Sequence, residues 1–264
     1  MENTFVHPNA KIGKNVVISP FSTIAEHVEI GDGTWIGPFV SINDYVKIGK
    51  NCKIFNGAVI GALPQDLKFK GEVSYVEIGD NVMIREYCTV SRGTAASGKF
   101  KTVIGNDTFL MAYVHVAHDC KVGSHVIIVS YTGLAGEADI DDWAIIGGAS
   151  AVHQFSLIGA HAMLSGGSLV GKDVPPFAMA GKRPLSFCGI NIIGLKRRGF
   201  TTEQIERIRD IYRVIYQSGM NVSAACKKVE ETFPESAEKR TILDFIAASK
   251  RGIIRYNPKL APEE

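Results

Sequence analysis

A period of six residues limits most strongly how this chain can fold. An aliphatic residue recurs at every sixth position over residues 6–60, 78–90 and 104–170. An α-helix repeats at about 3.6 residues and a simple strand at about two. A period of six therefore predicts short strands joined by tight turns, with one side chain of each hexad buried in a shared interior. Units of this kind stack as a solenoid.

Three hexads make one triangular coil of about 18 residues, and coils stack at the inter-strand spacing of about 4.8 Å. The period alone does not give the hand of the helix. Two segments break the period, residues 62–75 and 91–101, and both are predicted to be loops outside the prism. Long loops in compact folds are commonly functional. Gln65, Asp66 and Lys68 in the first loop indicate polar recognition.

The pattern changes at Pro175 and Pro176, which are expected to end the strand ladder. Beyond a short connector, Thr201 and Gln204 form a predicted capping box ahead of apolar residues at helical spacing. We expect three helices, over 201–218, 222–232 and 237–250, and a frayed polar tail at 257–264. The chain is therefore divided into a β-helix with its two loops and a C-terminal connector with a three-helix domain, at residues 1–185 and 186–264.

Composition excludes several classes of protein. Hydrophobic residues make up 45% and charged residues 21%, as in ordinary globular proteins, and a net charge of +2 is too small to indicate a nucleic-acid binder. No apolar run approaches the about 20 residues of a membrane span, and the N-terminus does not resemble a secretory signal. The five cysteines are dispersed without a CxxC pair, which favours free thiols in a cytoplasmic protein.

One edge of the predicted prism carries groups suited to acyl transfer. His118, Gly136 and Gln154 are spaced by 18 residues, so they stack on one edge, with His115 and His153 close by. A histidine can remove a proton from a sugar hydroxyl as the hydroxyl attacks a thioester. A glycine N–H can hold the developing oxyanion. Histidines in surface turns would give the same pattern.

The same histidines raise a metal-binding alternative. His115 and His118 could supply two zinc ligands, with His153 or His161 as a third. No metal-ligand spacing as compact as HExxH is present. Because a thioester is activated by position and electrostatics alone, we expect neither a metal nor a resident cofactor.

Longer motifs point to one family. They are FVHP, NGAVIGALPQDLKFKGE, AHDCKVG, LAGEADIDDWAIIGGASAVHQFSLIGAHAM, KDVPPF and GINIIGLKRRGF. Together they resemble the UDP-N-acetylglucosamine O-acyltransferases that begin lipid A biosynthesis, which are hexapeptide-repeat transferases. The resemblance implies a mainly β fold, a left-handed parallel β-helix followed by a small α-helical domain. It also implies transfer of a long (R)-3-hydroxyacyl chain from acyl carrier protein to the glucosamine 3-hydroxyl.

The resemblance also implies roles for individual residues. His118 would be the general base, Asp119 its partner, and the N–H of Gly136 the oxyanion donor. Gly166 would set the length of the acyl chain. The sugar nucleotide would be bound by Gln65, Asp66, Lys68, His115, His153, Gln154, Asn191 and Arg197. Members of the family are homotrimers with the site between two subunits.

Two positions depart from the family pattern. Glu137 stands where a histidine is frequent, and Ile193 stands where a glutamate is frequent. Four alternatives stay open: another hexapeptide-repeat acyl- or acetyltransferase, the sister N-acyltransferase with its extra N-terminal domain, a zinc-binding hexapeptide protein, and a non-catalytic scaffold.

Overall fold

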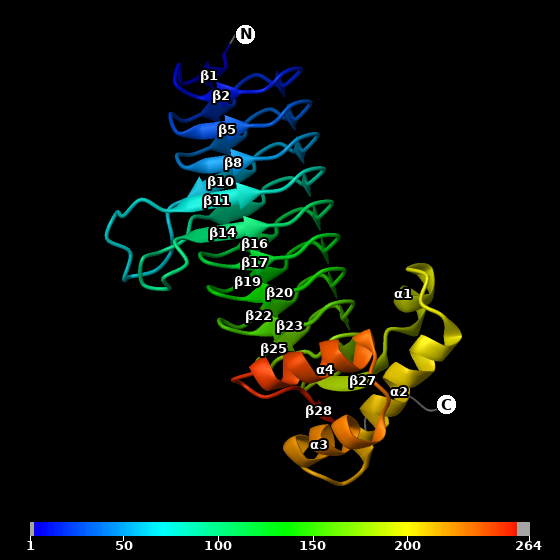
Figure 1. Cartoon of the computed structure of the whole chain (residues 1–264). Coiled ribbons are helices and arrows are strands. Elements are labelled where there is room, and N and C mark those ends of the chain that lie inside the picture. The colour runs from blue at the N-terminus through cyan, green and yellow to red at the C-terminus, as the bar shows by residue number, and fades with distance from the viewer. Residues whose placement is uncertain (1–2, 258–264) are drawn as a thin grey trace.

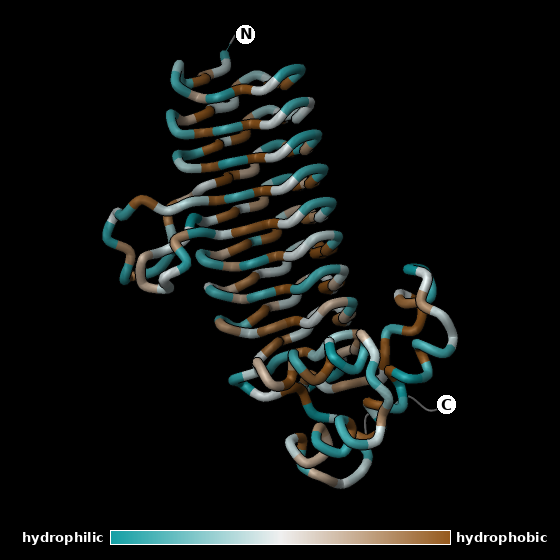
Figure 2. Tube along the Cα trace, viewed as in Figure 1, coloured by the Kyte–Doolittle hydropathy of each residue, from teal (hydrophilic) through white to brown (hydrophobic). Residues whose placement is uncertain are grey.

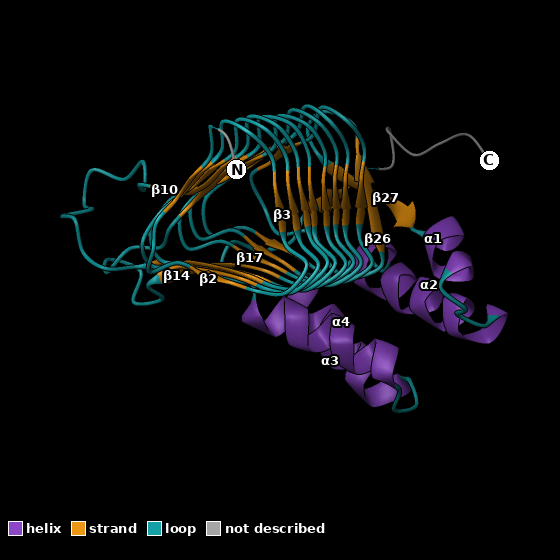
Figure 3. Cartoon of the chain, turned by 90° about the horizontal axis from the view of Figure 1, so that it is seen from above, coloured by secondary structure: helices purple, strands orange, loops and turns teal. Residues whose placement is uncertain are grey.

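The computed structural model describes residues 3–257 as a triangular prism of parallel strands with helices at its C-terminal end (Figure 1). Seen from above, three flat sheets form the sides of the triangle (Figure 3). Strands three apart in sequence pair in parallel, with partners such as Ile24 and Ile42 spaced by one coil. This is the stacked-coil arrangement that the period of six predicts.

The sheets are named A, B and C in chain order. Sheet A consists of β1 Phe5–Val6, β4 Thr23–Ile24, β7 Ser41–Ile42, β10 Val59–Ala62, β13 Thr89–Ser91, β16 His115–Val116, β19 Gly133–Leu134, β22 Ala151–Val152 and β25 Leu169–Val170. Sheet B consists of β2 Lys11–Ile12, β5 Val28–Ile30, β8 Val46–Ile48, β11 Tyr75–Ile78, β14 Lys101–Ile104, β17 Lys121–Val122, β20 Asp139–Ile140 and β23 Leu157–Ile158. Sheet C consists of β3 Val17–Ile18, β6 Trp35–Ile36, β9 Lys53–Ile54, β12 Met83–Ile84, β15 Phe109–Leu110, β18 Ile127–Ile128, β21 Ile145–Ile146, β24 Met163–Leu164, β26 Ala178–Gly181, β27 Ser186–Ile190 and β28 Arg255–Tyr256.

The hexad side chains fill the interior of the prism. From Ile24 onward they are almost wholly buried, and Ile54, Leu110 and Ile146 are 0% exposed. Figure 2 shows the resulting alternation of hydrophobic and hydrophilic segments along each coil. Because each layer of aliphatic residues packs on the next, the core runs along the prism axis.

The corners are tight turns that require positive φ angles, as at Asn51 (54°) and Asp119 (60°). A buried side-chain hydroxyl often forms hydrogen bonds with backbone groups of the turn. Thr34 Oγ1 donates to Gly49 O at 2.9 Å and accepts from Cys52 N at 3.0 Å. The strained backbone is therefore held by hydrogen bonds between neighbouring coils. We name the corners A–B, B–C and C–A after the sheets they join.

Both predicted loops leave the prism at the A–B corner. The first, residues 63–74, joins β10 to β11, and the second, residues 92–100, joins β13 to β14. Ile60 consequently pairs with Val90, 30 positions later, and the register shifts by one residue between Ile60 and Ala62, just before the first loop. In Figure 1 and Figure 3 the loops project from the side of the prism opposite α1.

The prolines do not end the ladder, contrary to the prediction. Ala180 in β26 pairs in parallel with Leu164 in β24, which adds another rung to sheet C. Pro175 and Pro176 occupy the corner before that strand, where no ladder N–H is needed. Strands β27 and β28 then extend sheet C towards the helices.

The helices are α1 Ile192–Arg197, α2 Thr202–Gln217, α3 Val222–Thr232 and α4 Ala237–Ala248. The capping box of α2 forms as predicted, with Gln204 N donating to Thr201 Oγ1 at 3.2 Å. Helix α1 lies in the segment predicted as a connector. None of the helices within residues 3–257 is long and apolar enough to cross a membrane.

Two predictions on this end of the chain stay open. The division at residue 185 is one of them, and β26 and β27 pair in antiparallel fashion across that point. The frayed tail is the other, since it lies outside the described residues from position 258 on.

Candidate active site

The A–B corner brings His118 and Asp119 into direct contact. His118 Nδ1 lies 2.9 Å from Asp119 Oδ2. Consecutive residues on a strand point to opposite faces, but this pair lies in the turn after β16, where Asp119 has a φ of 60°. Asp119 is fully buried and the His118 side chain is 17% exposed. A carboxylate on Nδ1 leaves Nε2 of the imidazole directed outward as a base.

The first loop places a second carboxylate beside the histidine. Asp66 Oδ2 lies 4.0 Å from His118 Nε2, and both side chains are mostly buried. Lys68 N donates to Asp66 Oδ1 at 2.9 Å, which forms a local turn that orients the carboxylate. The side chains of Gln65 and Lys68 are exposed next to it. The polar cluster of this loop therefore borders the histidine, as a recognition loop would.

Gly136 stacks directly below His118. Glu137 N donates to His118 O at 3.0 Å, and a Cβ atom on Gly136 would overlap the imidazole ring. Within residues 3–257, the N–H of Gly136 donates to no protein group. His153 and Gln154 occupy the next coil down and are exposed, with Gln154 O 3.0 Å from His153 Nδ1.

His115 precedes this corner on the outer face of sheet A. Its Nδ1 lies 2.6 Å from the hydroxyl of Thr89. Burial lowers the pKa of His115, and the nearby charge of His118 lowers it further. A neutral imidazole beside His118 can donate or accept a hydrogen bond without repelling a protonated His118.

The other predicted site residues lie on different edges of the prism. Asn191 caps α1: its amide donates to His161 O at 3.0 Å and accepts from Gly194 N at 3.1 Å, and it is 1% exposed. These contacts place α1 at the B–C corner, with Arg197 exposed in its last turn. Because His118 lies at the A–B corner, a single chain does not bring α1 to His118. Direct contact of Asn191 with a ligand stays a prediction.

Gly166 lies on the third edge, the C–A corner. A Cβ atom added there would be 3.2 Å from Gly148 O, a tight contact that a small shift relieves. Its φ is not positive, so the backbone admits a side chain. The predicted acyl-chain stop is thus separated from His118 by the width of sheet A.

The two departures from the family pattern are both accessible. Glu137 follows Gly136 at the A–B corner, is half-buried, and has no ion-pair or hydrogen-bond partner for its side chain among residues 3–257. Ile193 is 63% exposed on α1. Neither position alters the contact between His118 and Asp119.

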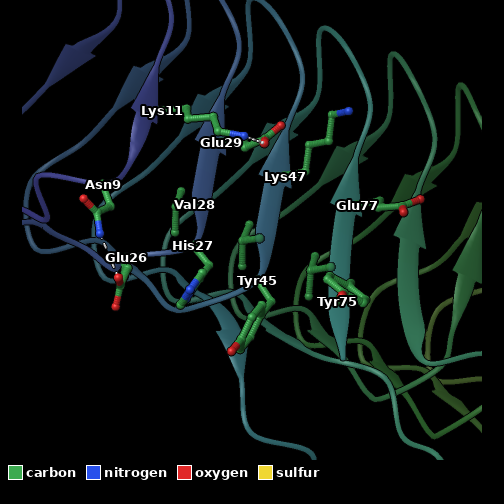
Figure 4. Close-up of a pocket in the computed structure, with 12 residues that line it drawn as sticks. Asn9, Lys11, Glu26, His27, Val28, Glu29, Tyr45, Lys47, Tyr75 and Glu77 are labelled. Carbon is green, nitrogen blue, oxygen red and sulfur yellow. Dashed lines mark hydrogen bonds and ion pairs between the residues drawn. The ribbon is translucent and has the colours of Figure 1, made fainter. Parts of the chain in front are cut away.

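No group of three or more His, Cys, Asp or Glu side chains that could hold a metal ion occurs within residues 3–257. The described part of the chain also contains a hollow of about 490 Å³ on the outer face of sheet B, near the N-terminal coils (Figure 4). Lys11 and Glu29 form an ion pair of 2.6 Å in it, and Asn9 donates to Glu26. Its lining extends to Tyr75 and Glu77 in β11, the strand that follows the first loop, and does not include His118.

Thr94 is a site neighbour that sequence reasoning missed. It lies in the second loop and donates its hydroxyl to Asp119 Oδ2 at 2.7 Å. The break in the period at residues 91–101 predicts the loop, but nothing in that break singles out one residue. A contact between positions 25 apart depends on the path of the loop.

The fold and the corner define a class of protein. A family model described as bacterial transferase hexapeptide (six repeats) matches residues 27–62 and 101–136. A second model, described as domain 2 of UDP-N-acetylglucosamine O-acyltransferase, matches residues 173–254. The chain is therefore a hexapeptide-repeat transferase, and its C-terminal part matches the second domain of UDP-N-acetylglucosamine O-acyltransferases.

Whole-chain comparisons narrow the class further. The acyl-[acyl-carrier-protein]–UDP-N-acetylglucosamine O-acyltransferase of Thiobacillus denitrificans is 47% identical over 250 residues, which span 95% of this chain and 96% of that protein. The crystal structure of a UDP-N-acetylglucosamine acyltransferase from Bacteroides fragilis superposes with a TM-score of 0.94 at 51% identity, over 97% of this chain and 99% of that one. The crystal structure of the UDP-N-acetylglucosamine acyltransferase from Francisella novicida superposes with a TM-score of 0.94 at 41% identity, over 100% of this chain and 99% of that one.

This chain belongs to the family of acyl-[acyl-carrier-protein]–UDP-N-acetylglucosamine O-acyltransferases. It is an acyltransferase, and its fold is the left-handed parallel β-helix with C-terminal helices that the resemblance implied.

Proposed function

We propose that this protein transfers a long (R)-3-hydroxyacyl chain from acyl carrier protein to the 3-hydroxyl of the glucosamine in UDP-N-acetylglucosamine, the first step of lipid A biosynthesis. The observation that carries the proposal is the A–B corner. It combines a histidine held at Nδ1 by the buried Asp119, a carboxylate 4.0 Å from Nε2, and an N–H of Gly136 that donates to no group in the described part of the chain. Membership of the family supports the choice of substrates.

The reaction is a direct transfer. Nε2 of His118 accepts the proton of the sugar 3-hydroxyl as its oxygen attacks the thioester carbonyl. The oxyanion that forms accepts a hydrogen bond from Gly136 N. The C–S bond then breaks, and the pantetheine thiolate takes the proton back from Nε2. Asp119 stabilises the imidazolium between the two proton transfers.

The sugar nucleotide is held from two sides. Asp66 is placed to accept a hydrogen bond from a glucosamine hydroxyl, since it faces the same nitrogen that removes the proton. Lys68 and Arg197 are exposed cations suited to the diphosphate. Because α1 lies on another edge of the prism, Arg197 reaches the nucleotide only from a second copy of the chain.

The outer faces of the sheets support a homotrimer. The outward residues of sheet B are mostly charged, including Lys11, Glu29, Lys47, Glu77, Lys121 and Asp139. Those of the parallel strands of sheet C from β3 to β26 are apolar except for one lysine: Val17, Trp35, Lys53, Met83, Phe109, Ile127, Ile145, Met163 and Met179. An apolar face of this length is typical of subunit interfaces.

The C–A corner is the proposed position of the symmetry axis. It carries a ladder of exposed aromatic rings at Phe21, Phe39, Tyr87, Tyr113 and Tyr131, and the rings of Tyr113 and Tyr131 stack at 4.9 Å. With this ladder on a threefold axis, sheet A of one copy faces sheet C of the next. The A–B corner then meets the neighbour's B–C corner, which carries α1, so His118 and Arg197 lie in one cleft.

The direct test is incubation of the protein with UDP-N-acetylglucosamine and acyl carrier protein thioesters of 10 to 16 carbons, read by mass spectrometry. A product heavier by one acyl chain supports the proposal, and recovery of unmodified sugar nucleotide with every donor contradicts it. Acetyl-coenzyme A serves as the comparison donor for a general acetyltransferase.

Sedimentation of wild type and Tyr113→Glu tests the trimer, because a buried charge on the axis should dissociate it.

We further propose a cytoplasmic location and no resident cofactor. All five cysteines are free thiols, three of them buried, as expected in a reducing compartment. The acyl donor brings its own phosphopantetheine. Metal analysis of the purified protein tests the zinc-binding alternative.

A further inference from the structure

The second loop, residues 92–100, is hydrogen-bonded to the carboxylate of Asp119. The Thr94 hydroxyl donates to Oδ2 at 2.7 Å, and Thr94 N–H donates to Oδ1 at 2.9 Å and to Oδ2 at 3.1 Å. Thr94 is 1% exposed and Asp119 is 0% exposed. Because water has no access, the orientation of this carboxylate depends on Thr94 and on His118 Nδ1.

This contact differs from the hydroxyl contacts that recur in the turns of the prism. Thr102 Oγ1 accepts from Asp119 N at 2.8 Å, and Thr108 Oγ1 accepts from Val126 N in the same way at another corner. Such contacts provide a hydrogen-bond acceptor for a backbone N–H of the turn wherever they occur. Thr94 lies outside the hexads, in a loop, so the repeat does not require its contact with Asp119.

The loop is shaped to approach the carboxylate closely. A Cβ atom on Gly93 would lie 2.6 Å from Asp119 Oδ1 and would overlap Lys101 N. Only glycine therefore allows Thr94 this position. Ala95 N donates to Glu72 Oε1 at 2.8 Å, which braces the second loop against the first, the loop that carries Asp66.

We propose that Thr94 is a positioning residue for the general base. Its hydroxyl holds Oδ2 of Asp119 in line with His118 Nδ1, so the imidazole keeps its proton on Nδ1 and presents an unprotonated Nε2 to the sugar hydroxyl. A histidine base in the wrong tautomer cannot accept the substrate proton. The inference rests on the acyl transfer proposed above, but the tautomer of His118 can be measured without it.

The test compares Thr94→Val, Thr94→Ser and Thr108→Val. Valine removes the hydroxyl at nearly constant volume and keeps the N–H contact, serine retains the hydroxyl, and Thr108→Val makes the same change at an equally buried threonine on the B–C corner. We expect Thr94→Val to lower kcat about tenfold, as for loss of a hydrogen bond to a charged group, with the KM for UDP-N-acetylglucosamine unchanged. Thr94→Ser and Thr108→Val should stay within about twofold of wild type.

The second readout is the tautomer of His118, from nitrogen NMR of protein labelled at its seven histidines. We expect the Nδ1–H form in wild type and Thr94→Ser, and a mixture with the Nε2–H form in Thr94→Val. An unchanged tautomer in Thr94→Val overturns the inference, whatever happens to kcat. If wild type transfers no acyl chain, the proposed function fails while the tautomer still tests Thr94. If Thr94→Val does not fold, Thr94→Ala removes the same hydroxyl and takes its place.

Discussion

The backbone of Gly136 lies against the imidazole ring of His118, closer than any side chain at that position would permit. Since the φ of Gly136 is not positive, alanine would fit the backbone and disturb only the ring. We expect Gly136→Ala to lower kcat about 100-fold, because the imidazole of the base is displaced from its position beside the oxyanion donor. Steady-state kinetics and a melting curve check this. A variant with wild-type kcat would contradict a catalytic role for the close contact between Gly136 and His118.

Loss of the base itself should have a large effect. We expect His118→Ala to lower turnover about 100-fold or more without unfolding the protein, as for removal of a general base. His27→Ala is the matched control, because His27 occupies the same corner in the N-terminal coils. Near-wild-type turnover in His118→Ala would exclude His118 as the base.

Stability should depend on pH through His161. Burial and the charge of Arg198 lower the pKa of His161 to about 4, against 6.5 in the unfolded chain. The unfolded state therefore binds more protons, so the contribution of His161 to stability is complete above pH 6.5 and is lost as pH falls towards 4. The ring stacks between Trp143 and Phe177.

His161→Phe keeps the stacking and removes the titration, and phenylalanine tolerates this turn, as Phe177 shows at a φ of 63°. We expect Tm to fall less between pH 7 and pH 5 in the variant than in wild type. Equal losses of Tm in the two proteins would show that His161 carries no such linkage.

The C-terminal helices should attract acyl carrier protein, which is strongly acidic. Lys196, Arg197 and Lys250 are exposed there, whereas Arg207 is ion-paired with Glu238. We expect charge reversal at Lys196 or Lys250 to raise the KM for the acyl donor about threefold at low salt, and added salt to reduce the difference. Lys14→Glu at the far end of the prism is the control. A salt-independent KM would indicate a contact made through pantetheine alone.

Gly166 should set the preferred acyl length. A long donor, of about 14 carbons or more, is expected for glycine at this position, since each buried methylene contributes about 0.8 kcal/mol. Gly166→Met should shift preference to donors roughly four carbons shorter, because its side chain fills a comparable length of groove. Relative rates for donors of 10 to 16 carbons check this. An unchanged profile in a folded variant would contradict it.

The amino-acid sequence alone determined the body of this protein. One aliphatic residue per hexad is a local pattern, and each coil needs only its neighbours to bury that residue, so the prism follows from the period. The two loops were predictable in the same way, because each interrupts this local pattern. The capping box at Thr201 and Gln204 likewise gave the start of α2, because a cap involves residues three apart.

Only the tertiary structure decided how the site is assembled. His118 and Asp119 meet because a turn with positive φ rotates two consecutive side chains towards each other, against the alternation expected on a strand. Thr94 reaches Asp119 because a loop outside the repeat folds back on it. The hexad period records which side chains are buried, not where an outward turn or loop points, so contacts on the outside of the prism depend on the three-dimensional path of the chain.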